Sequence, residues 1–193
     1  DTRQHISKDS GFSSWTEFLD EIGIEQSSLS TLDISYRSTH PIVRFAQNLL
    51  EDDDEPLPQT LRDGPEVEIF EFSNVGACVG FLSDVLTRLI LEEPLANIAL
   101  IAPNAELAEA YAAGLTTAEV DDVRLVLEQN FSFAPGIDVV PALDVKGLEF
   151  DYVVILDATA EYFPDTSHHR RLLHVAATRA VHQLWVTVSS RRS

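Results

Sequence analysis

Three segments place charged side chains within or next to predicted helices and strands. The most unusual charge is Arg179. Residues 170–180 predict a helix, and at 3.6 residues per turn Arg179 falls inside the apolar arc of that helix, whereas Arg171, His174 and Thr178 face away. A buried guanidinium is costly unless an anion pairs with it. Arg179 therefore predicts an internal salt bridge, a frayed helix end that lets the cation reach water, or an arginine directed at a phosphate.

The other two segments are shorter and lie at predicted loops. Residues 36–38 (YRS) directly follow a predicted strand and place a planar cation beside an aromatic ring. Residues 146–151 (KGLEFD) put Gly147 and Glu149 just before a predicted core strand. Taken singly, each segment is equally typical of an exposed arginine or an ordinary turn, so their meaning depends on their order along the chain.

The phosphate-binding loop of nucleotide-hydrolysing enzymes is missing. Its pattern is G-x-x-x-x-G-K-[ST], in which the lysine follows a glycine. The chain has two lysines, Lys8 and Lys146, and neither follows a glycine. Residues 152–161 imitate a Walker B strand ending in Asp157, but without a partner loop we interpret Asp157 as a strand-terminal residue that caps the next turn. The histidines lack metal-ligand spacing, so we expect no metal site.

The composition predicts one globular domain with a core. Apolar residues make up 45% of the 193 residues, and no run approaches the roughly 18 apolar residues of a membrane span. We expect a soluble cytoplasmic protein with no membrane partner. The net charge of −19 repels phosphate backbones, which argues against free-standing nucleic-acid binding. The chain begins at Asp1 and contains no methionine, so we expect an excised fragment.

The elements that must position these residues alternate along most of the chain. Helices are predicted at residues 14–22, 41–50, 75–91, 105–114 and 170–180, and residues 51–65 are predicted to be a loop. Strands are predicted at residues 31–35, 67–72, 98–101, 123–127, 137–140, 153–156 and 183–188. This alternation predicts a parallel sheet with helices on both faces. Ligands of such sheets bind beyond the carboxyl ends of the strands, so we expect the site residues to follow strands.

Four segments, in order, resemble the motifs of UvrD/Rep-like superfamily 1 helicases. DTRQHI at the start is similar to the end of motif III, DISYRSTHPIVRFA to motif IV, VKGLEFDYVVIL to motif V and RRLLHVAATRAVHQLWV to motif VI. The resemblance implies that residues 1–30 are the tail of motif III and a linker, and that residues 31–193 are the second RecA-like helicase domain. The implied fold is α/β, a RecA-like parallel sheet sandwiched between helices, of the P-loop NTPase type but without the P-loop itself.

The resemblance implies catalytic roles for three residues. Arg37 and Arg179 would contact the γ-phosphate of ATP as arginine fingers, and Gln4 would sense the same phosphate. ATP with Mg²⁺ is the implied cofactor, bound mainly by an N-terminal RecA-like domain of the same parent chain. We therefore expect this fragment alone to be inactive.

Three further residues would bind the nucleoside part of ATP by the same resemblance. Glu149 would hydrogen-bond the ribose, and Gly147 would permit close approach of the backbone. Tyr36, beside the motif IV arginine, would add an aromatic contact with the adenine.

Two departures from the unwinding helicases keep three functions open. Pro141 and Leu143 stand where the pattern T-x-H-x-x-K-G has its Thr and His, and about 110 residues between Arg37 and Gly147 leave no room for the large inserted subdomain. Both features resemble the HelD-like branch, whose members act on RNA polymerase. The first expectation is an ATP-dependent helicase or translocase on single-stranded DNA. The alternatives are a HelD-like RNA polymerase remodelling ATPase and an inactive RecA-like scaffold that binds proteins.

Overall fold

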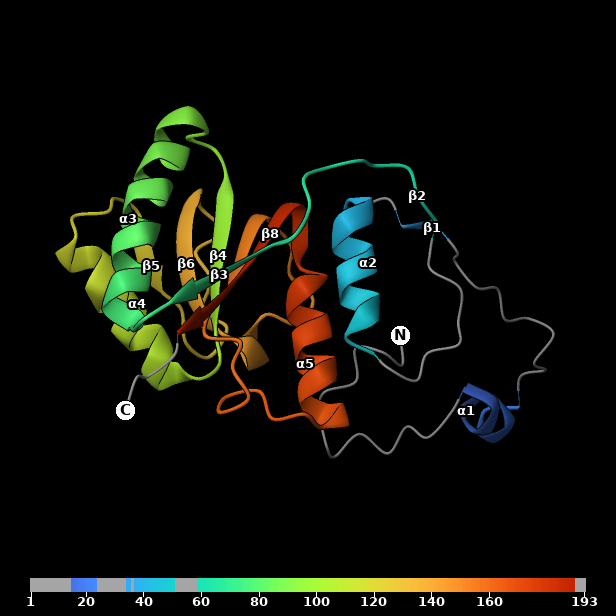
Figure 1. The fold of residues 1–193 in the computed structure, drawn as a ribbon. Coiled ribbons are helices and arrows are strands. Elements are labelled where there is room, and N and C mark those ends of the chain that lie inside the picture. The colour runs from blue at the N-terminus through green and yellow to red at the C-terminus, as the bar shows by residue number, and fades with distance from the viewer. Residues whose placement is uncertain (1–14, 24–33, 36, 51–58, 190–193) are drawn as a thin grey trace.

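The computed structural model describes residues 15–23, 34, 35, 37–50 and 59–189. Its centre is a six-stranded parallel sheet with the strand order β3-β8-β7-β4-β6-β5 (Figure 1). The strands are β3 (Glu68–Phe72), β4 (Asn97–Ala102), β5 (Val123–Leu125), β6 (Gly136–Pro141), β7 (Phe150–Ile155) and β8 (Ala180–Ser189). The predicted α/β class with a parallel sheet is confirmed.

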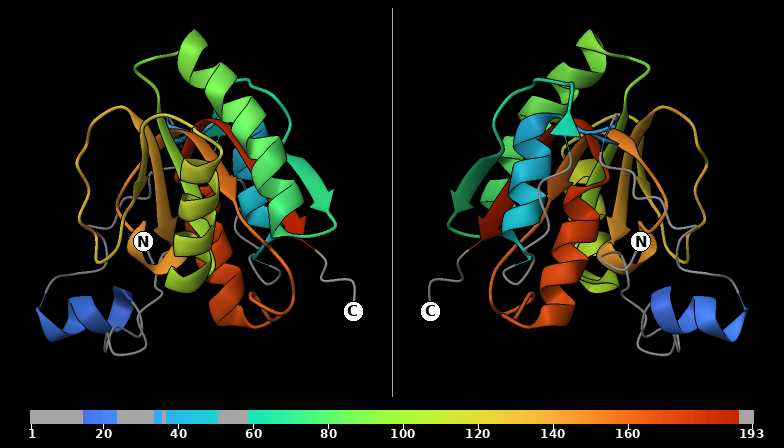
Figure 2. Two further views of the ribbon diagram at one scale, coloured as in Figure 1. Left: turned by 90° about the vertical axis from the view of Figure 1, so that its left-hand side faces the viewer. Right: turned by 90° about the vertical axis from the view of Figure 1, so that its right-hand side faces the viewer.

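Helices cover both faces of this sheet, as the alternation of elements predicts. The helices α3 (Val75–Glu92) and α4 (Ala105–Thr117) lie on one face, and α2 (His40–Asn48) and α5 (Ser167–Ala177) lie on the other (Figures 1 and 2). Two smaller helices are α1 (Trp15–Glu21) and the 3-10 helix η3 (Ala142–Asp144). No helix in the described ranges is long and apolar enough to cross a bilayer.

Strand β7 shows how the sheet divides the core. Val153 and Ile155 pack in the cluster with α2 and α5, whereas Val154 and Leu156 pack in the cluster with α3 and α4. Successive side chains of a strand point to opposite faces, so a strand covered on both faces is apolar at every position. The continuous apolar run at residues 153–156 is the result.

Helix α5 has the predicted length of 11 residues but lies three residues earlier, at Ser167–Ala177. It ends at Ala177 rather than at residue 180, so Arg179 lies in the tight turn before β8, where its N–H donates to Ala176 O at 3.1 Å. His174 was predicted to face away from the core, but it is only 6% exposed and its Nδ1–H donates to Ala46 O at 3.0 Å. The prediction was wrong because α2 packs against the outer side of α5, a contact that helical periodicity alone does not reveal.

The predicted loop at residues 51–65 also contains a short strand. Strand β2 (Gln59–Thr60) pairs in parallel with β1 (Ile34–Ser35), with Ile34 opposite Gln59. A strand of two residues is too short to leave a period-2 pattern in the sequence. The β1–β2 pair matters for function because the segment carrying Arg37 follows β1 directly.

Candidate functional site

The candidate residues lie at the amino ends of the central strands, not beyond the carboxyl ends as predicted. Gly147 and Glu149 precede β7, and Arg179 precedes β8. Of the described candidates, only Arg37 follows a strand, and that strand belongs to the separate β1–β2 pair. A helix that connects two parallel strands runs back along the sheet, so the turn after α5 reaches the amino edge. The prediction was wrong because the motif VI arginine lies at the end of a helix rather than the end of a strand.

An ion pair joins two of these residues across the chain. Arg37 Nε lies 2.5 Å from Glu149 Oε2, and the two side chains are 48% and 58% exposed. Exposed ion pairs contribute at most about 1 kcal/mol, because water screens the charges. Both groups can therefore exchange this partner for a ligand at little cost.

Arg179 is buried beside this pair, with 1% of its surface exposed. Its guanidinium donates to neutral oxygens: Nε to Val175 O at 3.0 Å, Nη1 to Leu148 O at 2.9 Å and Nη2 to Thr178 Oγ1 at 3.1 Å. Within the described part of the chain, no carboxylate pairs with it directly. The internal salt bridge is thus not observed there, and neither is a frayed helix end that exposes the cation.

The pKa of Arg179 reflects this environment. Burial lowers the pKa to about 10, the nearby charge of Arg37 lowers it too, and Glu149 raises it. The guanidinium is still protonated at neutral pH, because a pKa of about 10 lies well above that pH. A buried cation that is held only by neutral oxygens is stabilised when an anion approaches it.

Ser38 holds the Arg37 segment against the turn that carries Arg179. Its Oγ donates to Ala180 O at 2.7 Å, and Thr60 Oγ1 donates to Ser38 O at 2.9 Å. Ser38 is only 4% exposed. Sequence reasoning missed this role, although a serine directly after a candidate anion-binding arginine was a usable signal.

A cavity of about 420 Å³ lies at this amino edge. It is lined by Arg37, Asn97, Phe131, Phe133, Asp138, Gly147, Leu148, Glu149 and Phe150. Three predicted site residues are therefore brought together, and Arg179 bonds to the carbonyl of a fourth lining residue. The sequence did not predict the two phenylalanines at positions 131 and 133, which come from the loop between β5 and β6.

Gly147 has a backbone conformation that favours glycine, and its role in permitting close approach to a nucleotide stays a prediction. Its φ is +84°, a left-handed conformation that L side chains rarely adopt, and an added Cβ would meet nothing within 4 Å. The glycine therefore permits the backbone turn, and close packing does not require it. Tyr36 and Gln4 lie outside the described residues. The described ranges contain no group of His, Cys, Asp or Glu side chains that could hold a metal ion.

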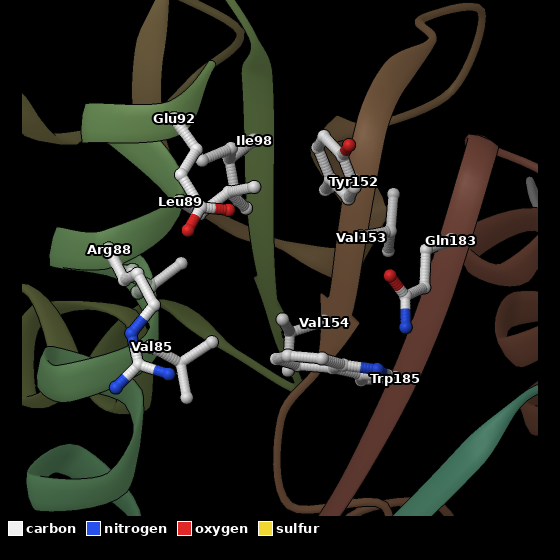
Figure 3. A pocket seen from close by; sticks show the side chains of 11 residues that line it. Val85, Arg88, Leu89, Glu92, Ile98, Tyr152, Val153, Val154, Gln183 and Trp185 are labelled. Atoms are coloured by element: carbon white, nitrogen blue, oxygen red, sulfur yellow. The ribbon is translucent and has the colours of Figure 1, made fainter. Parts of the chain in front are cut away.

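A second cavity, of about 140 Å³, lies under α3 (Figure 3). Side chains of α3, β4, β7 and β8 surround it, and Trp185 of β8 lies across it. Most of its lining is apolar, and none of the predicted site residues contributes to it. We therefore place the candidate site in the larger cavity, which is lined by the predicted site residues Arg37, Gly147 and Glu149.

The carboxyl edge carries a buried polar cluster, in which Asp157 Oδ1 has no hydrogen-bond partner among the described residues. Tyr111 OH donates to Asp157 Oδ2 at 2.8 Å, and the N–H of Asp157 donates to Thr187 Oγ1 at 3.2 Å. All three residues are at most 1% exposed. The side chain of Asp157 thus binds a tyrosine of α4 instead of capping the next turn, which corrects the prediction. Burial raises the pKa of Tyr111, so its hydroxyl stays protonated and donating.

Comparisons with known proteins agree with the predicted resemblance. Residues 143–187 match the UvrD-like helicase C-terminal domain family. The structure is similar to the crystal structure of the C-terminal domain of a possible DNA helicase from Lactobacillus plantarum WCFS1. That match has a TM-score of 0.66 and 29% identity, and it covers 82% of this chain and 90% of the other. No curated protein sequence matches the chain.

Two structures of the UvsW helicase of bacteriophage T4 are more distant. They have TM-scores of 0.41 and 0.42, with 10% and 13% identity. Each match covers 89% of this chain, and they cover 68% and 39% of the UvsW chains. The resemblance to the C-terminal domain of UvrD-like helicases is thus confirmed by the family match and by the first structure. The lean towards the HelD-like branch stays a prediction.

Proposed function

We propose that this chain is the second RecA-like domain of an ATP-dependent superfamily 1 helicase or translocase, and that it completes the ATP site with two arginine fingers. The observation that carries the proposal is the meeting of Arg37, Glu149 and Arg179 at one edge of the sheet. They come from three segments separated by 112 and 30 residues. The similarity to a helicase C-terminal domain supports the same proposal.

The two arginines suit phosphoryl transfer. The transition state spreads negative charge over the γ-phosphate oxygens, and a planar guanidinium meets such oxygens with fixed geometry. Arg179 is preorganised for this task, because three hydrogen bonds fix its position and leave its charge without a direct carboxylate partner among the described residues. Arg37 is the more mobile finger, since it is half exposed.

Glu149 has a second role in this proposal. In the free domain it holds Arg37 in the 2.5 Å ion pair. When ATP arrives, the phosphate replaces Glu149 as the partner of Arg37, and the carboxylate turns to the ribose hydroxyls. The exchange costs little, because an exposed ion pair contributes at most about 1 kcal/mol.

The phosphates and Mg²⁺ must be held by an N-terminal RecA-like domain of the parent chain. The sequence has no phosphate-binding loop, and the described residues offer no carboxylate set for a metal. The residues present fit the outer side of a bound nucleotide: two cations for the γ-phosphate and one carboxylate for the ribose. Closure of two such domains on ATP, and their reopening after hydrolysis, would move the nucleic-acid track.

Single-stranded DNA is the proposed track of the parent protein. This domain would contribute only weakly to DNA binding, because its net charge is −19 and Leu143, exposed by 55% at the carboxyl edge, cannot hydrogen-bond a phosphate. The same observation favours a second candidate, a motor that remodels a protein assembly. RNA polymerase, the partner implied by the HelD-like resemblance, stays a prediction from the sequence.

Phosphate release tests the half-site directly. The chain alone should show no turnover of ATP, with or without single-stranded DNA, and joining it to the N-terminal domain of its parent should produce DNA-dependent turnover. In the joined protein, Arg37→Ala should slow hydrolysis by about 1,000-fold with a much smaller change in KM. Arg44→Ala is the matched control, since Arg44 pairs with Glu66 at 2.6 Å outside the cavity.

Two outcomes would overturn the proposal. Turnover that survives rigorous purification of the chain alone would show that the site is not a half-site. If the Arg37→Ala protein hydrolyses ATP as fast as the Arg44→Ala protein, Arg37 does not act as an arginine finger.

A further inference from the structure

Three phenylalanines step outward from the core beside the candidate site. Phe150 at the start of β7 is 6% exposed, Phe131 is partly buried against it, and Phe133 is 79% exposed. The ring centroids of Phe131 lie 6.2 Å from Phe150 and 6.1 Å from Phe133. We call these three rings the aromatic stair: Phe150 belongs to β7, and Phe131 and Phe133 belong to the loop between β5 and β6.

Phe133, which carries the outermost ring, has a strained backbone conformation. Phe133 has φ 54°, a left-handed value that is an outlier for a bulky side chain. Strained residues of this kind persist where the surrounding structure fixes them, and they gather at functional sites. An exposed ring in a strained backbone contributes little to the core, so its position calls for another explanation.

Arg124 fixes the loop behind this ring. Its Nη2 donates to Ala134 O at 2.7 Å, its Nη1 to Pro135 O at 2.8 Å, and its Nε pairs with Asp138 at 2.7 Å. The Asp138 side chain is only 8% exposed, which anchors the guanidinium in the domain. The aromatic stair is therefore presented in one place, and a ligand would not have to order it.

The aromatic stair lines the same cavity as the ion pair. Phe131 and Phe133 share the 420 Å³ space with Arg37, Gly147 and Glu149. One cavity thus offers an aromatic wall, a carboxylate and a cation. A nucleotide has matching parts: a flat base, a ribose with hydroxyl donors and a phosphate chain.

We propose that Phe131 and Phe133 form a base-binding wall that stacks on the nucleobase of the bound nucleoside triphosphate. The proposal rests on the proposed function of the cavity and adds the group that contacts the base. A phenyl ring reads no hydrogen-bond pattern, so the wall accepts any base, and it favours the larger purines over pyrimidines because their stacking area is larger. Tyr36, the aromatic contact predicted from the sequence, would be a separate contribution.

Nuclear magnetic resonance of the isotope-labelled chain tests the wall. ATP and GTP at millimolar concentration should shift the amide signals of residues 131–133 and 147–149, and UTP should bind more weakly. Inorganic tripolyphosphate, which has no base, should shift the signals around Arg37 but not those of residues 131–133. Phe133→Ala should weaken ATP binding by about tenfold and leave tripolyphosphate binding unchanged.

Two further variants keep the result interpretable. Phe133→Tyr should retain the affinity for ATP, because it keeps the aromatic face. Leu91→Ala removes a side chain of similar exposure, 76%, at the end of α3 and should change nothing. Unshifted amide signals far from residue 133 establish that each variant is folded.

Different results would contradict the base-binding wall and the phosphate site. If Phe133→Ala binds ATP like the wild type while tripolyphosphate still shifts the signals around Arg37, the base wall is wrong and the phosphate site stands. If ATP shifts no signal at residues 131–133, the wall is likewise wrong. If Phe133→Ala weakens binding of the N-terminal RecA-like domain but not of ATP, the ring is a protein contact and the inference is overturned. If neither ATP nor tripolyphosphate shifts the signals around Arg37, the proposed function itself fails.

Discussion

The two edges of the central sheet use polar side chains in opposite ways. At the amino edge, Arg37 and Glu149 are about half exposed and line a cavity of about 420 Å³. At the carboxyl edge, Asp157, Tyr111 and Thr187 are buried and bonded to one another. The first group is exposed and can exchange its partners for a ligand. The second is shut off from solvent, although Asp157 Oδ1 has no hydrogen-bond partner among the described residues.

Asparagine side chains cap two helix N-termini at the carboxyl edge. Asn74 accepts from the N–H of Ala77 at 2.9 Å at the start of α3, and Asn104 accepts from the N–H of Leu107 at 2.9 Å at the start of α4. Free N–H groups at such positions bind phosphate in nucleotide-binding folds. Here each asparagine cap occupies one of these N–H groups, that of Ala77 or that of Leu107. A parallel sheet therefore does not by itself locate the site, whereas exposed charged side chains that line a cavity mark a candidate.

The largest expected effect is the loss of Arg179. In the protein joined to its N-terminal domain, Arg179→Ala should lower kcat by about 1,000-fold or more, and lysine should rescue little, because it lacks the planar fork. The isolated domain should still fold. Losing three hydrogen bonds is offset by removing a buried cation whose pKa of about 10 represents a cost of roughly 3 kcal/mol.

Steady-state ATPase kinetics and urea unfolding of the same variant separate the two roles of this arginine. An Arg179→Ala chain that unfolds, in a parent that still hydrolyses ATP, would make the residue structural and would remove the contrast between the two edges.

The carboxyl edge should respond in the reverse way. Tyr111→Phe removes the hydroxyl that donates to Asp157, and the buried carboxylate then loses a hydrogen bond. The free energy of unfolding should fall by about 2 kcal/mol, while kcat and KM of the joined protein stay unchanged. Urea unfolding measures the first quantity. A large loss of ATPase activity in a folded Tyr111→Phe protein would place chemistry at the carboxyl edge.

Glu149→Gln should have a smaller effect, confined to binding. The amide accepts a ribose hydroxyl less strongly than the carboxylate does, so KM for ATP should rise by about tenfold with kcat nearly constant. The difference between the KM values for ATP and for its 2′-deoxy analogue should be smaller in the variant than in the wild type. Equal KM values for Glu149→Gln and wild type would leave the carboxylate with the ion pair as its only role.

The smallest effect is expected at Ser38. Ser38→Ala removes one buried hydrogen bond, to Ala180 O, and should lower the free energy of unfolding by about 1 kcal/mol. Because Arg37 then loses its fixed neighbour, kcat should fall only a few-fold, far less than in Arg37→Ala. A Ser38→Ala protein as slow as Arg37→Ala would mean that the serine itself contacts the nucleotide.

Local patterns predicted the sheet and its covering helices, because strands buried on both faces are apolar throughout and helices repeat every 3.6 residues. They also marked Arg179 as buried, since it interrupts an apolar arc. They could not reveal that α2 covers His174 or that the site opens at the amino edge, because both depend on contacts between distant segments. Phe131 and Phe133 were missed for the same reason: an exposed aromatic residue on a loop leaves no periodic signal.

The central claim is that the amino edge, with Arg37, Glu149 and Arg179, meets the phosphates of ATP. A crystal structure of the joined protein with ADP and aluminium fluoride, an analogue of the transferred phosphoryl group, measures this contact. We expect Nη atoms of Arg179 within hydrogen-bond distance of the fluoride ligands, and Arg37 released from Glu149. A nucleotide bound instead at the carboxyl edge, beside Asn74 and Asn104, with Arg37 and Glu149 still paired, would contradict the account.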